Sequence, residues 1–134
     1  MPRCYLLTVC TGSSLDESSN NFSLFNLVEQ VQVGAQAPAE LVLPLEVHIH
    51  LAWSETEFDL PHELRWVVRT EGGGEVLGPV QPLCANSPHL RLRSFGLTVP
   101  RFSGPSEVRV EWRSAGSVEW TREPAWWPLQ LAHV

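Results

Sequence analysis

The chain has 134 residues, 43% hydrophobic and 18% charged, which predicts one folded domain over residues 1–134 and excludes a disordered segment. The net charge is −6 and all nine basic residues are arginine, which argues against nucleic-acid binding and excludes catalysis by a lysine. The chain has no run of about 18 apolar residues, and its first apolar run is short for a signal peptide. We therefore expect a cytoplasmic protein with no membrane partner.

The first part of the chain predicts two strands separated by a loop. Residues 3–10 alternate between two fairly apolar faces, which is typical of a central strand. Residues 11–21 collect Gly, Ser, Asp and Asn and are expected to form a loop. Residues 22–33 fit either a helix or a strand, and their β-branched end favours a single strand.

The stretch Leu41–Trp53 gives the clearest signal in the chain. Its apolar residues fall on every second position, as in a long strand with one buried face. Pro44 lies near its start and cannot donate a backbone hydrogen bond, so an edge, a bulge or a bend is expected there.

The remainder of the chain predicts further strands at short intervals. Alternating segments cover 63–70, 89–99, 107–112 and 118–123, and a last strand runs through Leu129 and Leu131. The alternation changes parity near residues 94–96, which indicates a bulge or a change of face. Eight or nine short strands without a convincing amphipathic helix predict an all-β fold, a single antiparallel β-sandwich, with a β-barrel as the alternative.

Two segments of the chain have a recognisable pattern: residues 22–31, FSLFNLVEQV, which follow Asp16 and Asn20-Asn21, and the closing stretch 106–131. Both resemble segments of a family of small uncharacterised bacterial and phage proteins. The resemblance covers about half of the chain and implies a compact β-sandwich with no assigned activity. This chain differs in having a longer Ser-rich segment before Phe22 and no Gly in the turn, and no functional residue carries over.

Candidate metal ligands occur together at one place. Glu46, His48 and His50 alternate with the apolar residues of the 41–53 strand, so their Cα atoms are roughly 6.5–7 Å apart on one face. Two histidines at this spacing can bind one zinc ion, with a further ligand from His62, His89 or Asp59. The same pattern also describes the solvent face of an amphipathic strand. Cys4, Cys10 and Cys84 form no CxxC pair and are expected to be free thiols.

Aromatic residues near the C-terminus are candidates for an interface. Trp120, Trp126 and Trp127 lie close to Arg122 in the sequence, and tryptophan and arginine are enriched in binding hot spots. Trp126 and Trp127 are adjacent, so in a strand they point to opposite sides. The alternative is that these residues pack within the fold, as we expect for Trp53, Trp66 and Trp112 on apolar faces.

The function that these observations favour is a non-enzymatic module that binds a protein partner or a second copy of itself. No G-x-S-x-G motif or other nucleophile motif occurs, so no catalytic residue and no cofactor is predicted. One alternative is a metal-binding protein or metal-dependent enzyme that uses Glu46, His48 and His50, with zinc as the expected ion. A second alternative is a carbohydrate-binding sandwich that uses exposed tryptophans.

Overall fold

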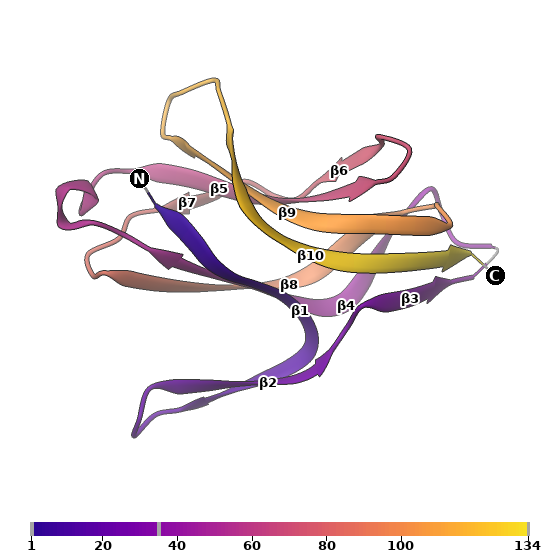
Figure 1. The fold of residues 1–134 in the computed structure, drawn as a ribbon, viewed down its shortest axis with the longest axis horizontal. Coiled ribbons are helices and arrows are strands. Elements are labelled where there is room, and N and C mark those ends of the chain that lie inside the picture. The colour runs from indigo at the N-terminus through magenta and orange to yellow at the C-terminus, as the bar shows by residue number, and fades with distance from the viewer. Residues whose placement is uncertain (1, 35, 134) are drawn as a thin grey trace.

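The structure is a computed structural model that describes residues 2–34 and 36–133, and in these residues it contains ten strands and one short 3-10 helix, η1 (Glu55–Glu57). In the same residues, no helix combines the length and apolar character that a membrane crossing requires. The strands form two sheets (Figure 1). The first sheet has the order β2 (Asn21–Leu27), β1 (Arg3–Asp16), β4 (Glu40–Ala52), β8 (His89–Pro100).

The second sheet has six strands and one appended strand. Its order is β3 (Gln30–Val33), β10 (Thr121–His133), β9 (Gly104–Ser114), β5 (His62–Thr70), β6 (Glu75–Leu77), and β7 (Gln81–Leu83) also pairs with β5. Neighbouring strands are antiparallel except β3 and β10, which are parallel. The predicted all-β sandwich is therefore confirmed, with one parallel pair at an edge.

Strand β4 lies in the middle of the first sheet and supplies much of the core. Val47, Ile49 and Leu51 are almost fully buried, as their alternation predicts. The core continues on the inner faces of both sheets, through Leu7, Val9, Leu64, Trp66, Val68, Leu97, Val99, Val108, Val110, Leu129 and Leu131. Burial of these side chains is the main force that holds the two sheets together.

A bulge interrupts the pairing of β4 with β8. The register shifts between Leu43 and Glu46, so two residues of β4, including Pro44, lie opposite a single residue of β8. That residue is Gly96, whose φ of 93° is accessible to glycine without a Cβ penalty. The bulge explains why the apolar pattern of β8 changes parity here, and it allows Pro44 to lie in a central strand.

The first third of the chain departs from the prediction. Residues 11–16 belong to β1, and only residues 17–20 form the turn, where Asp16 accepts hydrogen bonds from Ser18 and Asn20 has a φ of 59°. The segment 22–33 is divided between β2 and β3, which lie in different sheets. The small polar residues 11–16 form part of a strand because β1 pairs with β2. This pairing cannot be predicted from the strand propensities of the residues themselves.

Candidate functional site

The β1–β2 hairpin folds beneath the side of β4 that faces away from the core. The Ser13 hydroxyl donates a 2.7 Å hydrogen bond to Oε1 of Glu46. The Phe22 ring lies 6.0 Å from the ring of His48 and 5.9 Å from that of His50. The first sheet is therefore curled, and in Figure 1 the hairpin runs below β4 and β8. We call the region formed by Cys10, Ser13, Phe22, Glu46, His48 and His50 the enclosed face.

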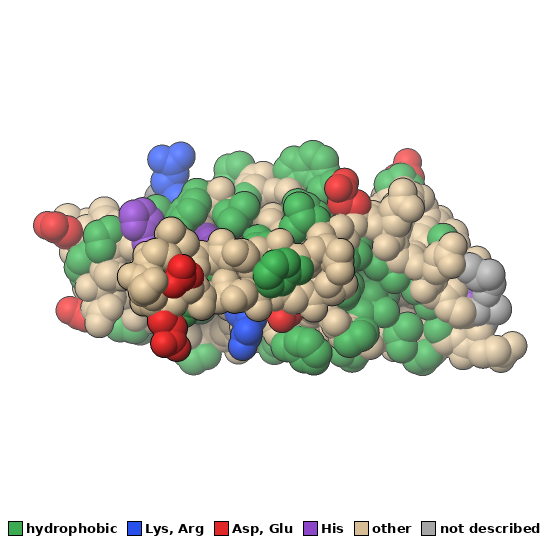
Figure 2. Space-filling model, turned by 90° about the horizontal axis from the view of Figure 1, so that it is seen from below, with side chains coloured by type: hydrophobic (Ala, Val, Ile, Leu, Met, Phe, Trp, Pro, Cys, Tyr) green, Lys and Arg blue, Asp and Glu red, His purple; other side chains and the backbone are tan. Residues whose placement is uncertain are grey.

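Enclosure changes the environment of the predicted metal ligands. His48 and His50 are only 1% and 6% exposed, although they point away from the core. Figure 2 views the molecule from below, the side on which the hairpin lies, and shows hydrophobic side chains together with scattered acidic and fewer basic ones. The histidines are thus held in a layer between the sheet and the hairpin, and do not form a solvent face.

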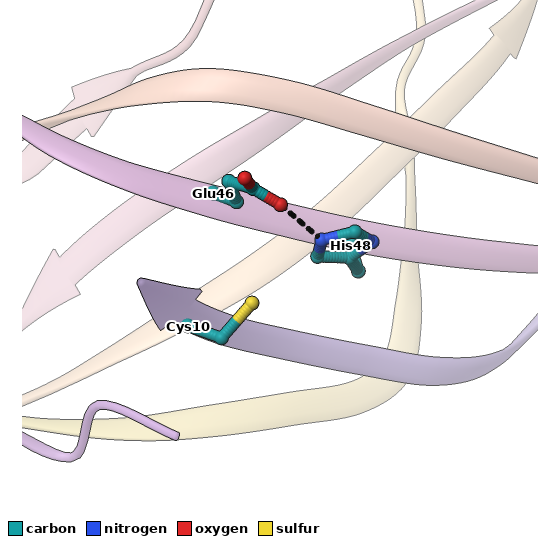
Figure 3. Close-up of side chains that lie close together, drawn as sticks. All are labelled: Cys10, Glu46 and His48. Carbon is teal, nitrogen blue, oxygen red and sulfur yellow. Dashed lines mark hydrogen bonds and ion pairs between the residues drawn. The ribbon is translucent and has the colours of Figure 1, made fainter. Parts of the chain in front are cut away.

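Glu46 and His48 come together with a residue that the sequence did not associate with them, Cys10. Cys10 is directly paired with Glu46 across β1 and β4. One potential ligand atom from each of Cys10, Glu46 and His48 lies within 4.8 Å of the others (Figure 3). Nε2 of His48 donates to Oε1 of Glu46 at 2.8 Å, and Sγ of Cys10 donates to the Gly12 carbonyl at 3.3 Å.

The environment shifts the pKa values of two of these groups. The Ser13 hydroxyl, followed by the hydrogen bond and charge of His48, lowers the pKa of the Glu46 carboxyl even though burial opposes this. Burial, and then the negative charge of Glu46, raises the pKa of the Cys10 thiol. Glu46 is therefore an ionised acceptor at neutral pH, and Cys10 is a protonated thiol unless a cation is bound.

His50 occupies a separate part of the enclosed face. Its ring lies 6.3 Å from that of His48, makes an edge contact with the Tyr5 ring and is tilted against the Phe22 ring. Its Nε2 is buried without a hydrogen-bond partner. Burial, followed by the charges of His48 and Arg91, lowers its pKa. Of the three predicted ligands, Glu46 and His48 thus lie together, and His50 lies in an aromatic environment.

An open pocket of about 440 Å³ lies at one end of the enclosed face. It is lined by residues around the β1–β2 turn and the start of β8: Asn20, Phe22, Ser87, Pro88, His89 and Arg91. The Arg91 guanidinium lies 4.9 Å from the centre of the Phe22 ring. The pocket therefore lies between β2 and β8, the two edge strands of the first sheet, which the contact of Arg91 with Phe22 bridges.

Two of the predicted interface residues are engaged within the fold. The Trp120 ring makes cation–π contacts with the guanidinium groups of Arg65 and Arg113, whose carbon atoms lie 4.1 and 4.2 Å from the ring centre. Arg122 pairs with Glu75 and Glu111, each at 3.0 Å. Trp120 thus packs the loop before β10 against the second sheet, and Arg122 links β10 to β6 and β9 through ion pairs.

Trp126 and Trp127 point in opposite directions, as their adjacency predicts. Trp126 is 56% exposed, whereas Nε1 of Trp127 donates to the Val28 carbonyl at 2.7 Å. Trp53, Trp66 and Trp112 are buried. A carbohydrate site would therefore have one well-exposed tryptophan ring, and carbohydrate binding stays a prediction.

The edge position of strand β2 is the feature that sequence reasoning missed, although a strand was predicted over this segment. Strand β2 is an edge strand that pairs only with β1 in the first sheet, and its sequence NFSLFNL contains no charge and no proline. Phe25 and Leu27 are 51% and 54% exposed. The apolar residues of this segment were visible, but its position at an edge depends on the topology.

No protein-family model matches the chain, and no curated protein matches it. The resemblance to small bacterial and phage proteins therefore stays a prediction, and the functional argument depends on the geometry.

Proposed function

We propose that this protein is a non-enzymatic interaction module that self-associates by pairing strand β2 of one copy with β2 of another. The observation that carries the proposal is an uncharged, proline-free edge strand with exposed apolar side chains. An edge strand presents unpaired backbone N–H and C=O groups, and proteins usually protect such edges with charges, prolines or short length. Strand β2 has none of these protections.

Comparison with the other sheet edges supports β2 as the pairing strand. Strand β8 carries Arg91 and Arg93, β3 has four residues, and β6 has three. Charge and short length both disfavour strand addition. Asn26 has a φ of 53°, which turns the backbone near the end of β2, so regular pairing is expected over residues 21–25.

The absence of charge on strand β2 fits a second copy as the occupant. Two molecules of net charge −6 repel each other, so self-association favours a contact segment without charge of its own. An antiparallel β2 pair meets this condition because no like charges face each other. A cytoplasmic location without nucleic acid or membrane as partner is part of the proposal, supported by the free thiols of Cys4, Cys10 and Cys84 and the acidic charge.

The test is the oligomeric state measured by analytical ultracentrifugation over a range of concentrations. The wild type should form dimers, and Phe25→Arg should shift the protein to monomer because it places a charge on the pairing strand. Val42→Arg is the matched control: Val42 is 65% exposed on β4, which is not an edge strand. Trp126→Ala is a second control for the exposed tryptophan.

The pattern of variants that lose the dimer identifies which surface forms the interface. Dimers that are lost only with Phe25→Arg support β2 pairing. A wild type that is monomeric at all concentrations, or dimers that persist in Phe25→Arg, would overturn the proposal. Dimers lost with Val42→Arg or Trp126→Ala, and kept with Phe25→Arg, would assign the interface to those surfaces.

A further inference from the structure

We propose that Cys10, Glu46 and His48 form a zinc-binding site on the enclosed face, independent of self-association. The three residues supply a sulfur, an oxygen and a nitrogen, and these potential ligand atoms all lie within 4.8 Å of one another. Zinc accepts this mixed set of thiolate, carboxylate and imidazole ligands. The site differs from the one that the sequence indicates, because Cys10 takes the place of His50.

The geometry requires only small movements to admit the ion. Zinc–ligand bonds of roughly 2.0–2.3 Å in a tetrahedron place ligand atoms roughly 3.3–3.8 Å apart. The Glu46 oxygen and the His48 nitrogen are 2.8 Å apart and must separate slightly, and the Cys10 sulfur already lies within 4.8 Å of both atoms. Side-chain rotations suffice for these changes, because Cys10 and Glu46 are paired on adjacent strands.

Charge balance favours an ion in this position. A Cys10 thiolate and a Glu46 carboxylate carry two negative charges, which Zn²⁺ neutralises in a site where a bare charge is costly. Binding forms Zn–S, Zn–O and Zn–N bonds. The Cys10 thiol proton and the Nε2 proton of His48 pass to water, and Nδ1 of His48 takes up a proton from water, so the ring binds zinc through Nε2 and stays neutral. A water molecule completes four-coordination on the side of Glu46, whose side chain is 12% exposed.

Ser13 has the position of an outer-shell partner. Its hydroxyl donates to Oε1 of Glu46 at 2.7 Å, which fixes the orientation of the carboxylate. Outer-shell hydrogen bonds of this kind commonly change metal affinity by roughly 10- to 100-fold. Because Ser13 lies on the hairpin, metal binding would also hold the hairpin against β4.

The experiment is a titration of metal-free protein with Co²⁺, a spectroscopic substitute for zinc, followed by displacement with Zn²⁺. We expect one equivalent to bind, with a thiolate-to-cobalt charge-transfer band and the visible bands of a tetrahedral site. Cys10→Ser should abolish the charge-transfer band, and Ser13→Ala should weaken binding by roughly 10- to 100-fold.

Two matched controls separate this site from the alternatives. Cys84→Ser changes an exposed thiol and His50→Gln changes the neighbouring histidine, and both should keep the band. Near-ultraviolet circular dichroism checks that each variant is folded, and Glu46→Gln replaces Cys10→Ser if the latter unfolds, with weaker binding expected. No cobalt uptake by the wild type, a band that persists in folded Cys10→Ser, undiminished binding by Glu46→Gln, or loss of the band in His50→Gln would overturn the proposal.

Discussion

His50 shows how the enclosed face controls a single ionisable side chain. Burial and the nearby charges of His48 and Arg91 lower its pKa from the usual 6.5. As pH falls below 6.5, the unfolded chain takes up the His50 proton before the folded chain does, so this residue lowers the free energy of unfolding. The loss of stability starts as the pH falls to the pKa that His50 has in the unfolded chain. It is complete below the lower pKa that His50 has in the folded protein.

The free energy of unfolding should depend more strongly on pH in the wild type than in His50→Gln. Urea unfolding at a series of pH values from about 7 to about 5 should show a steeper loss for the wild type, because Gln does not titrate. A resonance of His50 that titrates at or above pH 6.5 in the folded protein would contradict this account.

Trp120 and Trp126 contribute unequally to stability although both lie near the C-terminus. Trp120 makes cation–π contacts with Arg65 and Arg113, whereas Trp126 is largely exposed. Two cation–π contacts near the surface are worth roughly 0.5–1 kcal/mol each, so Trp120→Ala should lower the free energy of unfolding by about 1–2 kcal/mol. Trp126→Ala should change it by less than about 0.5 kcal/mol. Equal effects of the two substitutions in urea unfolding would disprove the assignment.

At the scale of elements, the connection between β6 and β7 depends on a close approach of backbone to ring. A Cβ added to Gly78 would lie 2.5 Å from ring atoms of Trp66, which is 2% exposed and therefore unable to move aside. Gly78→Ala should lower the free energy of unfolding by about 1–3 kcal/mol, the usual cost of overpacking. Gly12→Ala is the control, since no atom lies within 4 Å of its added Cβ. Urea unfolding that shows Gly78→Ala as stable as the control would refute the steric argument.

Strands could be predicted from the sequence where one face is buried and apolar residues therefore alternate with polar ones. Strand β4 was predicted to within a residue at each end, because alternating apolar residues there meet the core. The extension of β1 to Asp16 could not be predicted, because its Ser and Gly residues form strand only through pairing with β2. The parallel pairing of β3 with β10 joins segments about one hundred residues apart, which no local pattern indicates.

At the scale of the whole molecule, topology creates both candidate sites. Cys10 and Glu46 are 36 positions apart, and their contact follows from the pairing of β1 with β4. The alternating pattern of β4 places His48 on the polar face of the strand. Its burial could not be predicted, because it depends on the β1–β2 hairpin that covers this face. The sequence could therefore predict the fold class and two of the three proposed ligands, but not the thiol or the exposed edge.

The central claim is that β2 pairs with a second copy, and amide hydrogen exchange measures this directly. Exchange is measured at a low and at a high protein concentration. The β2 amides should exchange more slowly at the high concentration, because pairing protects backbone N–H groups. Amides of β3, another edge strand, should exchange at the same rate at both concentrations. Exchange of β2 amides that does not depend on concentration would contradict the account.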